Sequence, residues 1–230
     1  MSRVTANKLS EDLLLHVKLE KNTKELQALL DYMRIEDLLK DLTSDENKLA
    51  FWINIYNAYY QILHSTEGLK NPEIYKAKQI PIAGNMFTLD DVEHGILRRY
   101  RWKYSLGYLP QFWAPSIIKK LAVKEVEYRI HFALNCGAAS CPAIAFYSAQ
   151  NIDDQLENAA DLFINNDTII DDIKKELKIT KLFQWFKADF RNVKTVLEKH
   201  LKKDLSSYKI MYKPYDWSEK IRNFEENSFD

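Results

Sequence analysis

The residues best suited to chemistry lie in one short stretch, residues 129–142. It holds both cysteines of the chain, Cys136 and Cys141, and His131 stands a few residues before them. A cysteine attacks a substrate as the thiolate, and a nearby histidine is a common base for forming it. The pattern therefore allows a thiol centre in which Cys136 is the nucleophile and His131 accepts its proton.

The residues between the two cysteines are small. Gly137, two alanines and Ser140 let a backbone or a ligand come close. Backbone amides around Gly137 could hold developing negative charge on a substrate. We therefore expect Asn135, Gly137, Ser140 and Cys141 to contact a ligand.

A second candidate base stands upstream of this turn. Thr88 and Asp91 have the spacing of a capping box, and the helix they open carries Glu93 and His94. Adjacent helical positions do not share a face, so Glu93 need not orient His94. We keep Glu93 and His94 as candidate catalytic residues. The basic and aromatic run that starts at Arg98 could bind an anionic ligand, although a capped helix end is the more ordinary interpretation.

A stripe of amide side chains follows the longest predicted helix, residues 44–64. Asn47, Asn54 and Gln61 are seven residues apart, and Asn57 lies on the same side. Buried amides need hydrogen-bond partners, so this stripe must face another polar surface. We favour a structural seam. The alternative is that Asn57 orients a catalytic group and that Asn54 contacts a ligand.

The elements that must position these residues are mostly helical. Leucines at three- and four-residue spacing predict a helical lead-in over residues 1–43. Residues 44–218 are expected to form a single α+β core domain, and 219–230 a polar tail. The predicted fold is α+β and helix-rich, with the long buried helix 44–64 packed on a small, mostly antiparallel sheet.

Hydrophobic periodicity and turn residues define the shorter elements. The stretch 129–136 alternates like a strand, and His200 stands among lysines, which predicts that it is solvated. The remaining predictions are a hairpin over 80–87, helices over 116–123, 151–165 and 193–205, and strands over 168–171, 177–182 and 208–212.

Composition excludes several classes of protein. In 230 residues, 33 basic side chains balance 33 acidic ones, so no overall field attracts nucleic acid. Without an apolar run of about 18 residues, no membrane span is predicted. The first residues carry no apolar signal segment, and a cytoplasmic protein is expected. In that reducing compartment the two cysteines would be free thiols.

Five separated motifs resemble the landmarks of the domain-of-unknown-function family 547. They are FWINIYNA (51–58), EHGILR (93–98), HFALNCGAASCP (131–142), FQWFKADF (183–190) and YDW (215–217). They occur in the family's order over roughly residues 45–217, and no activity is established for the family. The resemblance implies that the positions of Asn57, Glu93, His94, His131 and Cys136 are family features. In the family that the chain resembles, the position of Cys141 is sometimes serine, and the resemblance therefore implies that Cys136 is the stronger candidate nucleophile.

Two functions of different classes follow from these residues. The first is a thiol-dependent hydrolase or acyl transferase, in which Cys136 attacks, His131 or His94 is the base, and Asn57 orients the base or an oxyanion. Its difficulty is geometric, because in a regular strand Cys136 shares the core face of Ile130 while His131 points the other way. Its order is also unusual, since papain-like and transglutaminase-like enzymes place cysteine before histidine.

The second is a non-catalytic binding module for a small molecule, a peptide or an anionic ligand. A lowered thiol pKa distinguishes the two, because only the enzyme needs a reactive thiolate. Zinc held by His94, His131, Cys136 and Cys141 is a weaker alternative, because the cysteine spacing is loose for a structural site. Phosphate-loop, dinucleotide and nucleophile-elbow motifs are missing from the sequence, so we predict no metal and no cofactor.

Overall fold

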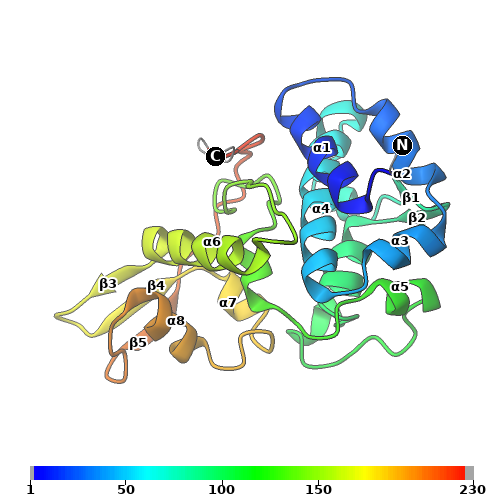
Figure 1. The fold of residues 1–230 in the computed structure, drawn as a ribbon. Helices are drawn as coiled ribbons and strands as arrows, with labels where there is room; N and C mark the ends of the chain where they lie inside the picture. The colour runs from blue at the N-terminus through cyan, green and yellow to red at the C-terminus, as the bar shows by residue number, and fades with distance from the viewer. Residues whose placement is uncertain (1–2, 226–230) are drawn as a thin grey trace.

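The computed structural model of the chain describes residues 3–225. Helices dominate the first two thirds, and the strands gather mainly in the last third (Figure 1). The α-helices are α1 (Ala6–Lys18), α2 (Lys24–Tyr32), α3 (Ile35–Asp41), α4 (Asp45–Glu67), α5 (Ser116–Leu121), α6 (Ile152–Asp167), α7 (Leu182–Trp185) and α8 (Val193–Leu201). Short helices of other types are η1 (Glu73–Tyr75), η2 (Asp91–Leu97), η3 (Lys103–Ser105) and η4 (Tyr128–Phe132). The strands are β1 (Ile80–Ile82), β2 (Asn85–Phe87), β3 (Ile169–Asp171), β4 (Glu176–Ile179) and β5 (Lys209–Tyr212).

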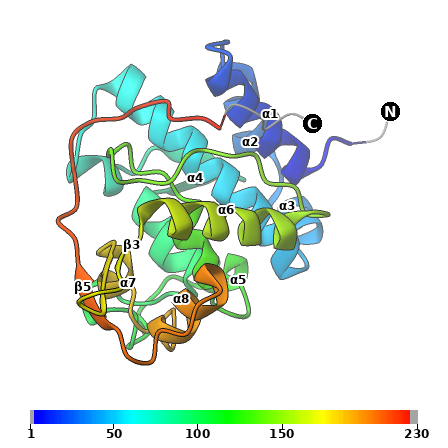
Figure 2. The same cartoon turned by 90° about the vertical axis from the view of Figure 1, so that its left-hand side faces the viewer.

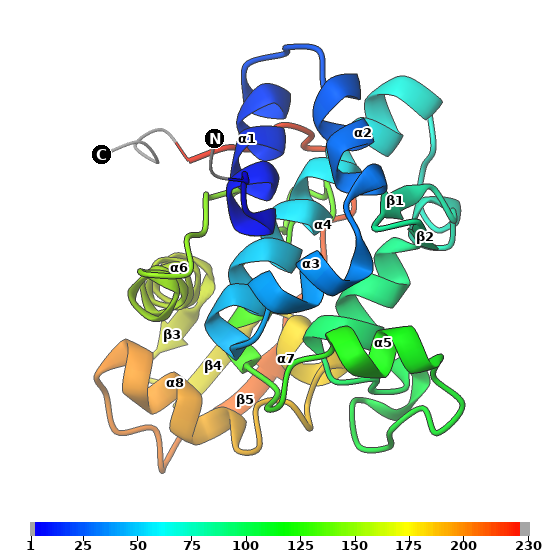
Figure 3. The same ribbon diagram turned by 45° about the vertical axis from the view of Figure 1, so that its right-hand side comes forward.

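Helix α4 is the centre of the larger hydrophobic cluster (Figure 3). It begins at Ser44, whose side chain accepts a hydrogen bond from the Asn47 amide, and it ends at Gly68 in the left-handed conformation. The helix begins where the sequence predicts and continues past the predicted end at residue 64 to Glu67. The helix is buried on nearly every side, because α1 packs along it and η2 packs beside it. The helical lead-in thus supplies part of the same core as α4.

A second, smaller hydrophobic cluster joins the sheet to two helices. Strand β4 pairs antiparallel with β3 and parallel with β5, while β1 and β2 form a separate antiparallel hairpin. Helices α6 and α8 supply apolar side chains to this cluster, as does Phe183 of α7. The α+β, helix-rich class is confirmed, but α4 packs mainly on other helices and the three-stranded sheet lies on the far side of α6 (Figure 1).

The predicted strand over 129–136 is not a strand. Residues 128–132 form the 3₁₀-helix η4, and irregular chain follows. The side chain of Asn57 explains this, because it donates to the Ala133 carbonyl at 3.0 Å and accepts from the Asn135 amide at 2.9 Å. Those backbone groups are the ones a strand ladder would need. A period-two pattern over so few residues could not reveal this side-chain partner.

The end of the chain crosses the molecule from β5 to α1 (Figure 2). We call residues 213–225 the strap. Within the predicted polar tail, Lys220 N bonds to the Gly137 carbonyl at 2.7 Å and Arg222 N bonds to Gln61 Oε1 at 3.1 Å. Residues 219–225 are therefore tied to α4 and to residues 136–141, which we call the cysteine loop. Residues 226–230 lie outside the described residues. Across residues 3–225, none of the helices combines the length and apolar character needed to cross a membrane.

Candidate functional site

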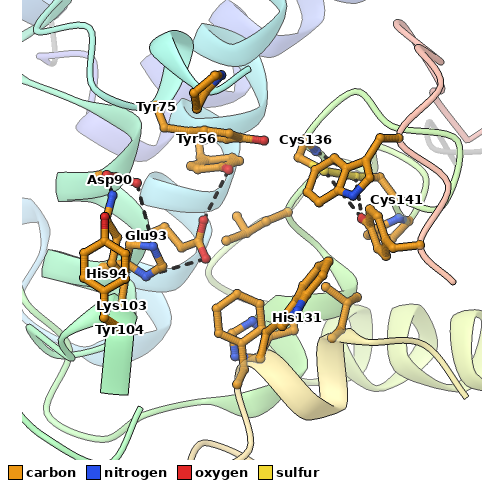
Figure 4. A pocket seen from close by; sticks show the side chains of 18 of the residues that line it. Tyr56, Tyr75, Asp90, Glu93, His94, Lys103, Tyr104, His131, Cys136 and Cys141 are labelled. Carbon is orange, nitrogen blue, oxygen red and sulfur yellow. Dashed lines mark hydrogen bonds and ion pairs between the residues drawn. A yellow bond between two sulfur atoms is a disulfide. The ribbon is translucent and has the colours of Figure 1, made fainter. Parts of the chain in front are cut away.

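A cavity of about 520 Å³ opens where the two hydrophobic clusters meet (Figure 4). Its volume is in the range of small-molecule sites. Helix α4, η2, the cysteine loop, α7 and the strap all contribute side chains. Seven of the lining side chains are aromatic: Tyr56, Tyr75, Tyr104, Trp185, Phe186, Tyr215 and Trp217. Asp90, Glu93, His94 and Lys103 come together on one side of the cavity, next to Tyr56 and Tyr104 (Figure 4).

A π-helical turn carries Glu93 and His94 to the same cavity. In η2 the amide of Arg98 bonds to the Glu93 carbonyl at 2.9 Å, which is a bond to the fifth residue back. Such wide turns are rare in proteins, and those that occur are often found at functional sites. They reduce the rotation between successive residues, so two neighbours can face one space. The expectation from a regular helix that Glu93 and His94 face different ways is therefore wrong here.

Glu93 is a largely buried carboxyl group whose surroundings favour its neutral form. Burial raises its pKa to about 7, and the positive charge of Arg98 only partly opposes that effect. Tyr56 OH donates to Glu93 Oε2 at 3.3 Å. The carboxyl points to the open centre of the cavity in Figure 4. A carboxyl group with a pKa near neutrality can both give and take a proton.

His94 is neutral, and its tautomer is fixed by Arg98. The Arg98 guanidinium can only donate, and its Nη1 lies 2.7 Å from His94 Nδ1. Nδ1 must then accept, which leaves the proton on Nε2, 3.7 Å from Asp90 Oδ1. Burial first, and the charge of Arg98 second, hold the pKa of His94 well below its usual value. His94 is thus a hydrogen-bond donor at Nε2, and a poor base.

Arg98 and Asp189 form a buried ion pair behind the cavity wall. Arg98 donates from Nε to Asp189 Oδ2 at 2.6 Å and from Nη2 to Oδ1 at 3.2 Å. Although burial opposes the charge of Asp189, hydrogen bonds from His131 and Arg98 hold its pKa at about 2. Because Arg98 is fully engaged, it is not a free anion-binding group.

His131 is a buried member of the same network. Its Nε2 lies 2.9 Å from Asp189 Oδ2, and its ring stacks on Phe186 with centroids 3.9 Å apart. Arg98 also lies over the ring of Phe186, with its guanidinium carbon 4.5 Å from the ring centroid. Burial lowers the pKa of His131 although Asp189 acts in the other direction. His131 therefore donates to Asp189 as a neutral ring and braces the cavity wall.

The two cysteines are joined, which corrects the expectation of free thiols. Cys136 and Cys141 form a disulfide, and both line the cavity. Tyr215 OH lies 3.5 Å from the first sulfur and 3.2 Å from the second. The Gly137 amide donates to Asn135 Oδ1, so it does not point at a substrate. In this state neither sulfur can act as a thiolate.

The amide stripe on α4 holds loops in place. Asn54 donates to the Tyr147 carbonyl at 2.7 Å and accepts from the Tyr147 amide at 3.1 Å. Asn57 does the same for the chain before the cysteine loop, and Asn135 donates to the Pro142 carbonyl at 2.6 Å. These contacts agree with the structural seam that the sequence favoured.

The predicted site residues thus separate into two groups. Five of them line the cavity: Glu93, His94, His131, Cys136 and Cys141. Six of them support it from behind or lie beside it: Asn54, Asn57, Arg98, Asn135, Gly137 and Ser140. Sequence reasoning missed Tyr56, Asp90, Lys103 and Asp189 as site residues. The family-like motif at 183–190 contains Asp189, and the motif at 51–58 contains Tyr56. Those motifs were the signal that could have identified these two residues.

His200 corrects another expectation, because it is buried. Its Nδ1 lies 2.6 Å from Asp161 Oδ1, and Tyr128 OH lies 3.0 Å from its Nε2. Within residues 3–225, His200, Asp161 and Glu157 are close enough to share a metal ion. Glu157 already pairs with Lys199, which gives this cluster a structural role. The four residues considered for zinc do not gather in this way, since two of them form the disulfide.

The chain belongs to the family described as "Protein of unknown function, DUF547", whose model matches residues 39–164. That range contains Glu93, His94 and the cysteine loop, while Asp189 and Tyr215 lie beyond it. Neither the comparison with curated proteins nor the comparison with solved structures gives a match.

Proposed function

We propose that this protein is an acid–base enzyme acting on a small, mainly apolar molecule that carries a carbonyl, ester or similar polarisable oxygen. The observation that carries the proposal is the buried Glu93 carboxyl, with a pKa of about 7, facing an aromatic cavity. Glu93 would take a proton from the substrate or from water. His94 Nε2–H and Lys103 stand on the same wall and would stabilise the negative charge that develops.

The thiol hydrolase or acyl transferase centred on Cys136 has weaker support. It would require the disulfide with Cys141 to be reduced before Cys136 could act as a nucleophile. The polar side chain near Cys136 is the Tyr215 hydroxyl, and His131 is committed to Asp189. The disulfide also leads us to infer an oxidising working compartment, in place of the reducing cytoplasm expected from composition. Acid-quenched alkylation of the native protein would test this, and labelled free thiols at both positions would reject it.

Ring opening of 5-nitrobenzisoxazole tests Glu93 without knowledge of the natural substrate. In this reaction a base removes the carbon-bound proton, the N–O bond breaks, and a coloured nitrile phenolate forms. A carboxylate in an apolar cavity is well suited to it. We expect a rate that rises with pH through about 7, as Glu93 loses its proton. We expect Glu93→Gln to lower the rate by roughly a hundredfold or more.

Two matched variants separate the candidate functions. Glu157→Gln removes another partly buried carboxylate and should leave the rate unchanged. Cys136→Ser combined with Cys141→Ser should retain most of the rate, whereas a thiol enzyme would lose it. If the wild type and Glu93→Gln are equally inactive, the acid–base proposal fails. The aromatic lining would then favour the binding module for a small ligand.

A further inference from the structure

One loop beside the cavity exposes an unusual share of large apolar side chains. Phe112 and Trp113 are 75% and 66% exposed, and Trp102, Tyr104, Tyr108 and Leu109 are also exposed. The segment forms the loop below α5 at the edge of the molecule (Figure 3). We call residues 102–113 the aromatic loop. A single exposed apolar side chain is ordinary, but a contiguous group of them marks an interaction site.

Three of the exposed rings in the aromatic loop form one group on a well-bonded backbone. The Trp102 ring meets Tyr104 and Trp113, with centroids 5.9 and 6.4 Å apart. Across the base of the loop, Trp102 N bonds to the Leu109 carbonyl at 2.9 Å. Exposure is therefore a property of the folded loop, because its own hydrogen bonds hold the side chains outward.

The sequence around the aromatic loop carries charged residues of one sign only. Residues 94–124 contain seven arginine and lysine residues and no aspartate or glutamate, although the whole chain is neutral. Arg98 and Lys103 pair with aspartates. In the part of the chain that the structure describes, Lys119 and Lys120 are exposed and form no ion pair. Lys119 Nζ donates to the Phe112 carbonyl at 3.0 Å, which ties this cation to the backbone of the aromatic loop.

We propose that the aromatic loop docks the protein on an anionic membrane surface. Tryptophan and tyrosine favour the headgroup level, and lysine stems lie along the apolar side while their ammonium groups reach anionic lipids. A single outlying loop is small for a stable protein interface, which needs about 800 Å² on each partner. It is sufficient for interfacial insertion, where a few rings and neighbouring cations act together.

Docking by this loop would place the cavity close to the lipid surface. Lys103, Tyr104 and Leu106 line the cavity from the aromatic loop itself. The inference rests on exposed side chains and charge, so it does not depend on the proposed function of Glu93.

Vesicle flotation of the full chain tests the proposal. The probes are vesicles of phosphatidylcholine and phosphatidylserine in equal parts, and vesicles of phosphatidylcholine alone. We expect at least tenfold stronger binding to the anionic vesicles, weakened by salt. Phe112→Ser with Trp113→Ser should lower that binding at least tenfold, and Lys119→Gln with Lys120→Gln roughly tenfold. Matched controls on the sheet are Ile173→Ser, where the side chain is 96% exposed, and Lys178→Gln with Lys209→Gln.

A spectroscopic measurement reports insertion directly. Brominated lipids in the anionic vesicles should quench tryptophan fluorescence, and Trp102→Phe with Trp113→Phe should remove most of the quenching. Trp217→Phe, on the strap, should leave it in place. Equal binding to both vesicle types, or binding kept by the Phe112 and Trp113 variant, overturns the proposal. A dimer in light scattering that this variant abolishes would instead assign the loop to a second copy of the chain.

Discussion

Glu93 and His94 are neighbours whose burial favours the neutral form of each. For a carboxyl group burial raises the pKa, and for an imidazole it lowers the pKa. Arg98 contributes in two further ways. Its charge lowers the pKa of His94, and its guanidinium, which can only donate, requires His94 Nδ1 to be the acceptor. The pair therefore presents one acid of pKa about 7 and one neutral donor to the same cavity. This division of roles within a cavity is typical of proton-transfer sites.

Glu93→Gln should change how stability depends on pH. The unfolded carboxyl loses its proton near 4.5, whereas folded Glu93 keeps it up to about 7. The folded state binds more protons in that window, so the stability contributed by Glu93 falls as the pH rises through it. The free energy of unfolding of Glu93→Gln, measured relative to the wild type, should therefore rise by roughly 3 kcal/mol between acidic and mildly alkaline pH. Urea unfolding at a series of pH values measures it.

The histidine supplies the control for this measurement. The pKa of His94 is lowered, so its stabilising effect is present above the unfolded value of 6.5 and is lost as the pH falls below it. His94→Gln should therefore reduce the loss of stability at acidic pH. This effect is opposite in sign to that of Glu93, whose stabilising contribution is greatest at acidic pH. A gap between wild type and Glu93→Gln that does not change with pH would contradict the assignment.

Asp189→Asn should destabilise the protein strongly. The change would leave Arg98 buried with its charge uncompensated, and one partner of His131 would be lost. Removing one partner of such a pair costs about 3–5 kcal/mol. Asp153→Asn is the matched control, because Asp153 pairs with Arg129 at an exposed position and should cost at most about 1 kcal/mol. Similar costs for the two variants in thermal unfolding would show that the buried network is not essential.

At the scale of elements, α4 holds the irregular chain that lines the cavity. The regions on either side of the cysteine loop lack regular structure, so their backbone groups need partners from elsewhere. Asn57 supplies them before the loop, and Asn54 supplies them at Tyr147. The helix is thus both the core of the larger cluster and the scaffold for the cavity wall.

Asn57→Ala should loosen one wall of the cavity. The Asn135 amide loses its acceptor, and the buried Ala133 carbonyl loses its donor. Such losses cost about 1–3 kcal/mol each. Hydrogen exchange at the Asn135 amide should become much faster, while the same change at exposed Asn165 should have little effect. Unchanged protection of the Asn135 amide would contradict this role for Asn57.

Regular elements were predictable because their signals are local. The start of the helix predicted over 44–64 and the Thr88 and Asp91 box appear in the structure as the sequence indicates. The site was predictable only in part. The π-helical turn that joins Glu93 to His94 has no simple sequence signature, and Asp189 is 91 residues from its partner Arg98. Side-chain bonds from Asn57 overrode the strand pattern at 129–136, and the disulfide changed the chemistry expected of the cysteines.

At the scale of the whole molecule, the strap connects the sheet to the first helices and closes the cavity on one side. It contacts the cysteine loop repeatedly: Tyr215 OH meets both sulfurs, Asp216 N bonds to Ser140 Oγ, and Lys220 N bonds to the Gly137 carbonyl. Ala139 N also bonds to the Ser218 carbonyl, and Ser140 N to the Asp216 carbonyl. A disulfide that fixes this loop therefore also fixes the strap. The strap runs from the sheet, in the smaller hydrophobic cluster, to Ile221 and Phe224, which pack on the larger one. It therefore also connects the two clusters.

Replacing both Cys136 and Cys141 by serine should detach the strap from the cysteine loop locally, with only a modest loss in the free energy of unfolding. Closing a loop this short contributes roughly 2 kcal/mol. The Lys220 amide should exchange faster and proteases should cut near residues 213–225 more readily, while amides of α4 keep their protection. A strap that is equally protected with and without the disulfide would contradict this coupling.

The central claim is that Glu93 is a proton donor and acceptor poised near neutral pH. A carbon-13 NMR titration of the glutamate side chains, with the Glu93→Gln variant used to assign the resonance, measures its pKa in the folded protein. The account predicts a resonance that titrates at about 7 and is missing from the variant. A Glu93 resonance that titrates near the ordinary value of 4.5 would contradict it, because such a carboxylate would already be charged and could not act as an acid in this cavity.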